Sequence, residues 1–173
     1  KGLFIYRVIP YHSILVMTKE KDLKIDIVSD VVCPWCYIGQ ERLNKALKMS
    51  GLKAEINWLP YQLNPDMPLE GADKFKFLED KFGGSGEAMF KRVKETADAE
   101  GLAFNTDNIA NIPNTVESHR VMHLAKEKGI QNEMAHAFFK AYFADGVDLT
   151  STEGVIDTAV NGGLDRDEVA AYL

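Results

Sequence analysis

The two cysteines of this chain lie three positions apart in the stretch SDVVCPWCYIG, as Cys33 and Cys36. Residues three apart share one face of a helix, so their sulfurs can form a disulfide with little backbone movement. A C-x-x-C motif between a strand and a helix of a β-α-β pattern is typical of a redox-active dithiol. The sequence therefore predicts thiol–disulfide exchange, in which Cys33 attacks or releases a substrate sulfur and Cys36 resolves the mixed disulfide.

We expect Cys33 at the start of a helix, where unpaired backbone N–H groups and the helix dipole favour a thiolate. Pro34 suits the first helical turn, because its missing N–H would have no partner there. A pKa lowered from about 8.5 to about 6 makes the Cys33 sulfur a good leaving group and stabilises the dithiol by roughly 1.4 kcal/mol near pH 7. Trp35 carries no charge, so it should stabilise the thiolate less than a protonated histidine in that position.

The residues around the motif predict a β-α-β unit that positions the cysteines. Residues 23–28 alternate apolar and polar side chains as a strand does, and residues 34–50 have helical spacing that stops at Gly51. Residues 53–63 alternate again and end at the turn-forming pair Asn64-Pro65. Such a unit normally closes as a right-handed crossover between parallel strands.

The rest of the chain has the spacing of helices. Capping-box spacing joins Asn114 to Glu117, Thr150 to Glu153 and Asp165 to Glu168. No strand is predicted after Asn64, and a two-stranded sheet is rarely stable by itself, so we expect the chain to lack a C-terminal portion. Helices are predicted over 73–82, 85–100, 114–128, 132–144 and 150–160, with the start of another at 165–173.

Composition limits the class of protein. The chain has 173 residues, of which 46% are hydrophobic and 27% charged, as expected for one globular domain with an apolar core. Its net charge of -6 leaves no basic stripe for a nucleic acid. Two cysteines are too few for a disulfide-stapled secreted scaffold.

The N-terminal residues 1–22 are interpreted as an extension. The apolar run 1–17 is broken by Arg7, Pro10 and His12 and has no small-x-small cleavage site, which disfavours a signal peptide. The run is also shorter than the roughly 20 apolar residues that span a bilayer. We expect Met17 to be the natural start.

The segment KIDIVSDVVCPWCYIGQERL resembles the opening of FrnE-type thiol oxidoreductases, in the DsbA-like branch of the thioredoxin superfamily. WLPYQLNPDMP resembles their second strand and turn, while GLAFN, NTVESHRVMHLA and AYFADGVDLT resemble their helical insertion and later helices. The resemblance covers roughly residues 24–173 and implies an α/β fold. This fold has a thioredoxin-like β-α-β unit with the C-x-x-C at 23–65 and a large helical insertion, followed by the start of a truncated C-terminal part, at 66–173.

The resemblance also implies further site residues. It places Asn114 and His119 at the wall of the active site; the alternative is that Asn114 caps a helix and His119 is a polar residue on its surface. Members of the family return to a ββα half with a cis-proline loop that holds the substrate. No proline follows Pro113, so we expect that half to be missing here.

The sequence thus predicts a cytoplasmic oxidoreductase that acts on protein or small-molecule thiols and disulfides, with no cofactor beyond the Cys33–Cys36 pair and no nucleic-acid or membrane partner. The first alternative is a glutathione-dependent isomerase or transferase of the hydroxychromene-carboxylate isomerase or kappa class, with glutathione as co-substrate. Those enzymes usually carry serine at the position of Cys33 and lack the resolving cysteine, so the motif disfavours this alternative.

Two further alternatives use other residues. His119 and His123 lie four apart and could complete a zinc site with the cysteines, although finger and HExxH spacings are absent. A non-catalytic binding module could present an apolar surface to a partner helix, although aromatic stripes at helical spacing usually belong to a core. The residues considered for that surface are Phe138, Phe139, Tyr142 and Phe143.

Overall fold

The computed structural model describes residues 23–83 and 86–173, so the expected extension 1–22 lies outside the described residues. Strand β1 (Leu23–Ser29) leads into helix α1 (Pro34–Ser50), and β2 (Ala54–Pro60) returns beside β1. The strands are parallel, with Leu23 opposite Ala54 and Ser29 opposite Pro60. Gly51 ends α1 in the left-handed conformation at φ 67. The predicted β-α-β unit is therefore confirmed.

Strand β2 ends earlier than the alternating pattern predicts. The structure stops it at Pro60, whose missing N–H cannot extend a strand ladder. The next residue, Tyr61, donates its N–H to the Ser29 carbonyl at 3.0 Å. Beyond it, the Leu63 N–H donates to Asp30 Oδ2 at 2.7 Å. A side chain of the β1–α1 turn thus replaces the sheet as hydrogen-bond partner of this segment.

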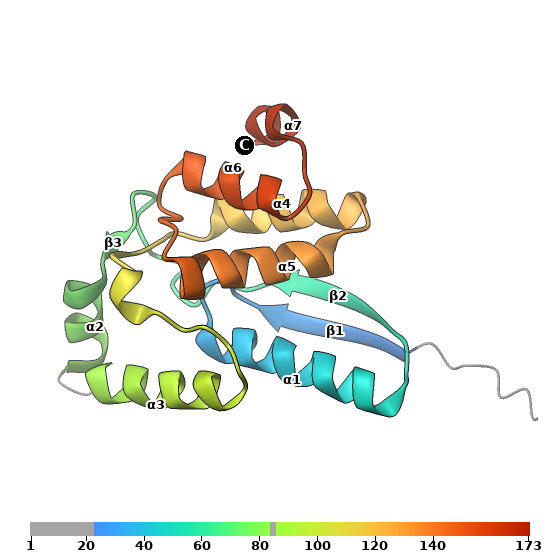
Figure 1. The fold of residues 1–173 in the computed structure, drawn as a ribbon. Helices are drawn as coiled ribbons and strands as arrows, with labels where there is room; N and C mark the ends of the chain where they lie inside the picture. Colours follow the sequence, from blue (N-terminus) through green and yellow to red (C-terminus); the bar gives the residue numbers. More distant parts are fainter. Residues whose placement is uncertain (1–22, 84–85) are drawn as a thin grey trace, which may run out of the picture.

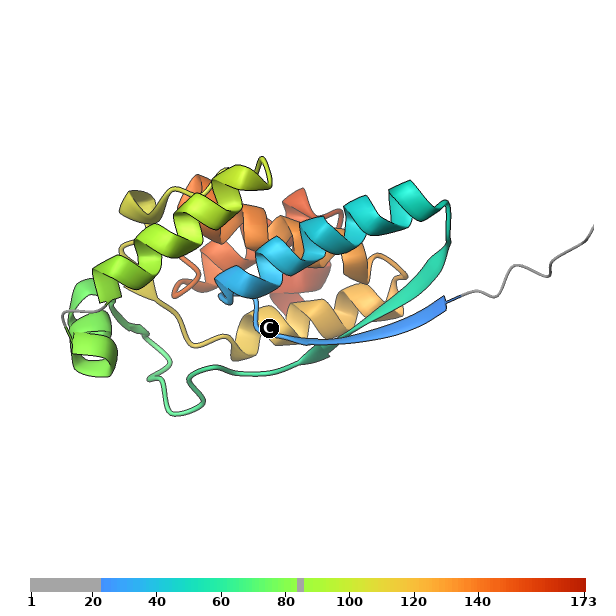
Figure 2. The ribbon, with the colours of Figure 1, turned by 90° about the horizontal axis from the view of Figure 1, so that it is seen from below.

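Helices form most of the remaining chain (Figures 1 and 2). In both views α4 and α5 lie next to β2, α6 and α7 lie further out, and α2 and α3 lie at the end where α1 begins. The bounds are α2 (Lys74–Phe82), α3 (Gly86–Ala99), α4 (Val116–Glu127), α5 (Gln131–Lys140), α6 (Thr152–Asn161) and α7 (Arg166–Tyr172), with a 3-10 turn η2 at Thr106–Asn108.

A short antiparallel pairing after Asn64 was not predicted. Strand β3 (Ala72–Asp73) pairs with β4 (Asn111–Ile112). The expectation that no strand follows Asn64 was therefore wrong, because a strand of two residues is too short to show an alternating pattern. The pairing connects the start of α2 to the segment before α4.

The capping predictions have mixed outcomes. Asp165 Oδ1 accepts the Glu168 N–H at 3.0 Å, as expected. Ser151 rather than Thr150 caps α6, because the Thr150 hydroxyl donates to Asp148 Oδ1 at 2.8 Å instead. The cap residue of α4 is Thr115 rather than Asn114.

The aromatic residues considered for a partner surface are in the core. Phe143 stacks on Tyr37 of α1 at 5.7 Å between ring centroids and on Phe104 at 5.1 Å. Phe139 contacts Tyr37 and Trp58. The interpretation of this cluster as an exposed docking surface is therefore wrong. The exposed fractions are 0% for Phe138, 1% for Phe139, 3% for Tyr142 and 2% for Phe143.

A π-helix explains how consecutive aromatic residues are buried together. The segment predicted as one helix over 132–144 changes at Ala141 into the π-turn η3 (Ala141–Asp145). Tyr142 and Phe143 both lie inside, with their rings edge-on at 5.0 Å. Gly146 ends the turn at φ 70, and a Cβ there would lie 2.4 Å from Asn108 Cβ, so a side chain has no room.

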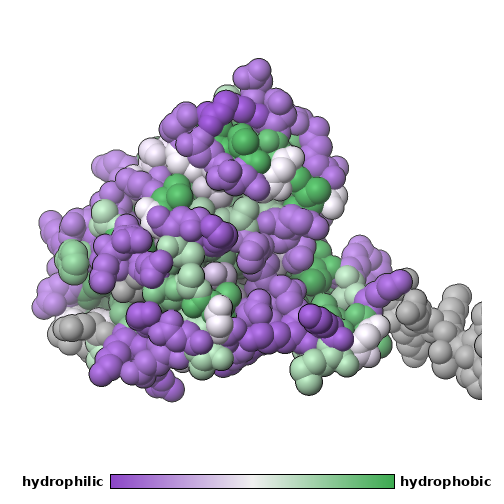
Figure 3. Space-filling model, viewed as in Figure 1, coloured by the Kyte–Doolittle hydropathy of each residue, from purple (hydrophilic) through white to green (hydrophobic). Residues whose placement is uncertain are grey.

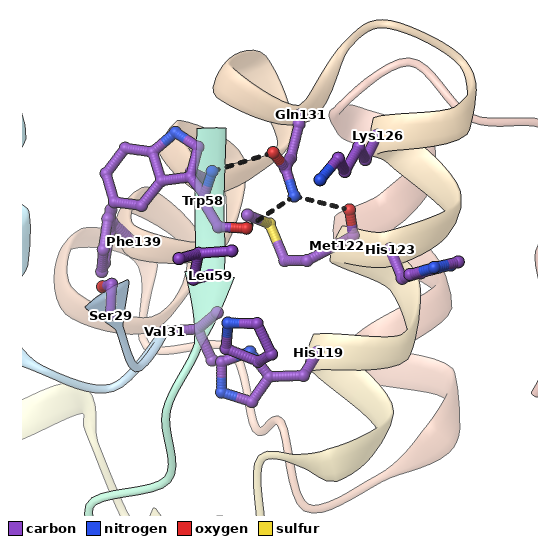
Figure 4. A pocket seen from close by; sticks show the side chains of 12 residues that line it. Ser29, Val31, Trp58, Leu59, His119, Met122, His123, Lys126, Gln131 and Phe139 are labelled. Atoms are coloured by element: carbon purple, nitrogen blue, oxygen red, sulfur yellow. Dashed lines mark hydrogen bonds between the residues drawn. The ribbon is translucent and has the colours of Figure 1, made fainter. Parts of the chain in front are cut away.

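The outer edge of β2 is satisfied by one side chain rather than by another strand (Figure 4). The Trp58 N–H donates to Gln131 Oε1 at 2.9 Å, and Gln131 Nε2 donates back to the Trp58 carbonyl at 3.0 Å. The same Nε2 donates to the Met122 carbonyl at 3.3 Å. Gln131 therefore fixes the start of α5 against β2 and the last turns of α4.

Hydrophilic residues cover most of the surface in the view of Figure 3, and hydrophobic ones form separate patches between them. In the described ranges no helix has the length and apolarity needed to cross a bilayer.

Candidate active site

Cys33 lies at the junction of the β1–α1 turn with helix α1. It is the cap residue of α1, with φ -88 and ψ 110, and Pro34 is the first helical residue. The Cys33 N–H donates to the Asp30 carbonyl at 3.0 Å, and the Cys33 carbonyl accepts the Cys36 N–H at 3.1 Å. The turn therefore holds Asp30 and both cysteines close together, as the spacing of the motif predicts for the cysteines.

The two cysteines are free thiols, and each shifts the pKa of the other. The hydrogen bond from Cys33 lowers the pKa of the Cys36 thiol to about 6, while burial opposes the lowering and the Ser29 side chain and Asp30 backbone support it. The pKa of Cys33 is raised, first by its hydrogen bond with Cys36 and then by burial of its side chain. The backbone N–H groups of Cys36 and Trp35 act in the opposite direction. One thiol of the pair therefore ionises readily, while the other keeps its proton.

The sequence predicts a lowered pKa at Cys33, and in the structure the two thiols interact, so that a lowered pKa belongs to the pair rather than to one sulfur alone. The helix N-terminus does act on Cys33 through backbone donors, as expected. Hydrogen bonds from the Ser29 side chain and the Asp30 backbone also lower the pKa of Cys36. Spacing alone could not reveal this, because both donors come from the turn before the helix.

Cys33 forms part of the wall of an apolar cavity of about 230 Å³, beside Pro34 and Trp35. Trp35 is 48% exposed at this position. Cys36 instead packs, partly buried, against the hydrophobic core. A substrate in the cavity would therefore meet Cys33. The facing wall comes from α2 and α3 and includes Phe77, Leu78, Phe82, Met89, Phe90 and Val93.

His119 reaches from α4 toward the end of β2, close to the turn before the cysteines (Figure 4). Its Nε2 lies 3.0 Å from the Tyr61 carbonyl and 3.4 Å from Asp30 Oδ1. Asp30 is 2% exposed. Sequence reasoning did not single out Asp30, because an acidic residue between a strand and a motif resembles an ordinary turn residue. Its only signal was its position three residues before Cys33.

Asn114 joins two loops through its side-chain amide. Its Nδ2 donates to the Met67 carbonyl at 2.7 Å, and its Oδ1 accepts from Gln62 Nε2 at 3.3 Å. The same Oδ1 accepts the Val116 N–H at 3.0 Å. Asn114 therefore holds the chain after β2 against the start of α4, and the described lining of the Cys33 cavity does not include it.

The two histidines considered for zinc point to different neighbours. His119 faces Asp30, whereas His123 is exposed, with its Nδ1 3.4 Å from the Tyr172 hydroxyl. Within 23–83 and 86–173, no group of three or more His, Cys, Asp or Glu side chains could hold a metal ion.

The lowered pKa predicts a distinct titration. One thiolate should appear with an apparent pKa of about 6, so roughly 90% of the dithiol carries it near pH 7. Because the pKa of Cys36 is lowered, the free energy of unfolding of the dithiol form should rise with pH from about 6 to the ordinary thiol value of 9.0. Above pH 9.0 the raised pKa of Cys33 has the opposite effect and offsets this gain. Thiolate absorbance against pH measures this; absence of a thiolate below pH of about 8 contradicts it.

The model of the family described as "DSBA-like thioredoxin domain" matches residues 24–173. This chain belongs to that family. In this chain the family's fold is a helix-rich α/β domain with a small parallel sheet.

Relatives of this DSBA-like chain are known by sequence and by structure. The uncharacterized protein YwbO of Bacillus subtilis is 26% identical over 142 residues, which make up 82% of this chain and 66% of that protein. A probable DsbA oxidoreductase of Streptomyces coelicolor is 33% identical with a TM-score of 0.77, covering 87% of this chain and 67% of its own. The cytosolic disulfide reductase DsbM of Pseudomonas aeruginosa, solved with GSH, shares the fold at 16% identity and a TM-score of 0.59. The match covers 87% of this chain and 70% of DsbM.

Proposed function

We propose that this chain is a thiol–disulfide oxidoreductase that exchanges disulfides through Cys33 and Cys36. The observation that carries the proposal is the pair of free thiols three residues apart at the start of α1, with Cys33 in the wall of a cavity. A lowered thiol pKa in a partly exposed position is the property of a reactive cysteine.

In the proposed reaction Cys33 attacks a substrate disulfide and forms a mixed disulfide, releasing one substrate thiolate. Its proton passes to Cys36, the thiol with the lowered pKa, as the attack proceeds. Cys36 then attacks Cys33 Sγ, which releases the second thiolate and leaves a Cys33–Cys36 disulfide. The substrate gains two electrons and the protein dithiol loses them; the reverse sequence oxidises a substrate dithiol.

The cavity suggests which thiols and disulfides fit. Aromatic and aliphatic side chains form most of its lining, and Lys81 is the charged residue among the lining residues. We propose substrates that carry an apolar group next to the reacting sulfur, either a protein segment or a small organic disulfide. Burial of one such group contributes about 25 cal/mol per Å² of apolar area.

We further propose a FrnE-type enzyme working in the cytoplasm. The motif CPWC and the segment NTVESHR support the FrnE assignment. A transient catalytic disulfide suits a reducing compartment, where structural disulfides are rare. Glutathione is a reasonable reductant for the pair, since DsbM, which shares the fold, was solved with GSH.

Reduction of insulin by glutathione tests the proposed activity. We expect the wild-type chain to accelerate the reaction and the Cys33→Ser variant to match the buffer, because the attacking sulfur is removed. The Ser50→Ala variant, which changes an exposed residue at the far end of α1, serves as control and should keep the wild-type rate. Equal rates for wild type and Cys33→Ser would contradict the proposal.

A further inference from the structure

A second cavity lies between β2 and α4 (Figure 4). Its volume is about 200 Å³, and none of its described lining residues belongs to the wall of the cavity beside Cys33. The proposed thiol chemistry leaves this β2–α4 cavity without a role. Apolar side chains form most of its lining, and among them are Val31, Trp58, Leu59, Met122, Ala135 and Phe139.

The β2–α4 cavity is large enough for a molecule with one ring. An apolar protein cavity of about 150 Å³ holds benzene, and the volume here is greater. Trp58, Ala135 and Phe139 belong to the buried core, so this part of the wall is already formed. A ring-sized apolar group can therefore leave water for this cavity without a rearrangement of the fold.

Most polar side chains of the lining already have partners within the protein. Gln131 bonds to the backbone of β2 and α4 through both its carbonyl and its amide nitrogen. His119 Nε2 lies 3.0 Å from the Tyr61 carbonyl. His123 Nδ1 lies 3.9 Å from Glu127 Oε1 on the exposed side of α4. These three side chains are therefore poor candidates for holding a ligand.

Lys126 differs from them because its positive charge has no opposite charge beside it. Its side chain extends toward Gln131 at the cavity (Figure 4). Within 23–83 and 86–173 Lys126 forms no ion pair, and the described lining of the cavity contains no acidic residue. A cation at the edge of an apolar wall favours a ligand that combines a negative charge with an apolar body.

We propose that the β2–α4 cavity binds a small organic carboxylate, whose ring-sized apolar body lies against Trp58 and Met122 and whose carboxylate pairs with Lys126. An uncharged hydrocarbon would leave the ammonium group unpaired. Inorganic phosphate would leave the apolar wall in contact with water. Neither thiol takes part in this binding, so the inference goes beyond the proposed function and does not depend on it.

Titration with sodium benzoate at neutral pH, followed by nitrogen–proton NMR, tests the site. The chain has two tryptophans, Trp35 and Trp58, and therefore gives two indole N–H signals, which the Trp35→Phe variant assigns. Trp58 lines the β2–α4 cavity, whereas Trp35 lines the cavity beside Cys33. We expect benzoate to shift the Trp58 signal until it saturates and to leave the Trp35 signal in place.

The role of the Lys126 charge is tested with a neutral ligand and a matched variant. Benzamide has the ring and size of benzoate without its charge, and it should bind the wild-type chain about tenfold more weakly. Lys126→Gln should weaken benzoate binding about tenfold and leave benzamide binding within about twofold of wild type. The control is Lys48→Gln, the same change at an exposed residue in the last turn of α1, which should keep the wild-type affinity for both ligands.

Lys126 is exposed on α4, so its replacement leaves the buried core intact. A Trp58 signal that does not move with benzoate up to about 10 mM would overturn the proposal, as would a shift confined to Trp35. Unchanged benzoate affinity in Lys126→Gln, or an equal loss for benzoate and benzamide, would contradict the pairing of the carboxylate with Lys126.

Discussion

Replacement of Cys36 with alanine is expected to stop turnover and leave the first exchange intact. Cys33 would still attack, but no sulfur would remain to displace the substrate from the mixed disulfide. We expect the steady-state rate of insulin reduction to fall by roughly a thousandfold, because Cys33 and Cys36 act as a unit and the variant cannot resolve the mixed disulfide. Mass spectrometry of the stalled protein should show the substrate sulfur bound to Cys33.

Cys36→Ala also separates the two enzyme classes considered for this chain. A glutathione-dependent isomerase uses one sulfur or hydroxyl and would tolerate the loss of Cys36. Cys36→Ser, which keeps the size of the side chain and a hydrogen-bond acceptor for Cys33, is the matched control and should stall as well. A Cys36→Ala protein with nearly normal turnover and no mixed disulfide would contradict the dithiol mechanism.

Replacement of Phe143 with alanine is expected to cost about 3–5 kcal/mol of unfolding free energy. The ring is 2% exposed and stacks on Tyr37 of α1 and on Phe104, so its removal leaves a cavity where the π-turn η3 packs against α1. Phe143 also lines the cavity beside Cys33. Urea denaturation followed by circular dichroism measures the loss.

The matched control is Phe75→Ala, the same change at a side chain that is 74% exposed on α2. It should change the unfolding free energy by less than about 0.5 kcal/mol. Similar losses for the two variants would show that the stack of Tyr37, Phe104 and Phe143 does not hold the π-turn against α1.

The elements around the cysteines could be predicted because each has its own local signal. Alternation identified β1, a proline and a glycine marked the ends of α1, and C-x-x-C spacing required the two cysteines to share a helix face. Most helices of the second half could be located for the same reason, since their apolar residues recur at helical spacing.

The features that were missed depend on contacts distant in sequence. The β3–β4 pair is too short to show a pattern, and the π-turn differs from an α-helix only in where Tyr142 and Phe143 point. Gln131 replaces a strand at the edge of β2 from 73 residues away. Asp30 meets His119 only because α4 packs beside the end of β2. Long-range packing rather than local preference thus decides which polar groups face the thiols.

Reversible disulfide formation between Cys33 and Cys36 is the central claim, and a redox titration tests it most directly. The chain should be equilibrated in glutathione buffers of increasing oxidised fraction, acid-quenched and mapped by mass spectrometry. The account predicts a cooperative two-electron transition to a Cys33–Cys36 disulfide that returns fully to the dithiol on reduction. Two thiols that remain reduced, or that each take glutathione independently across the series, would contradict it.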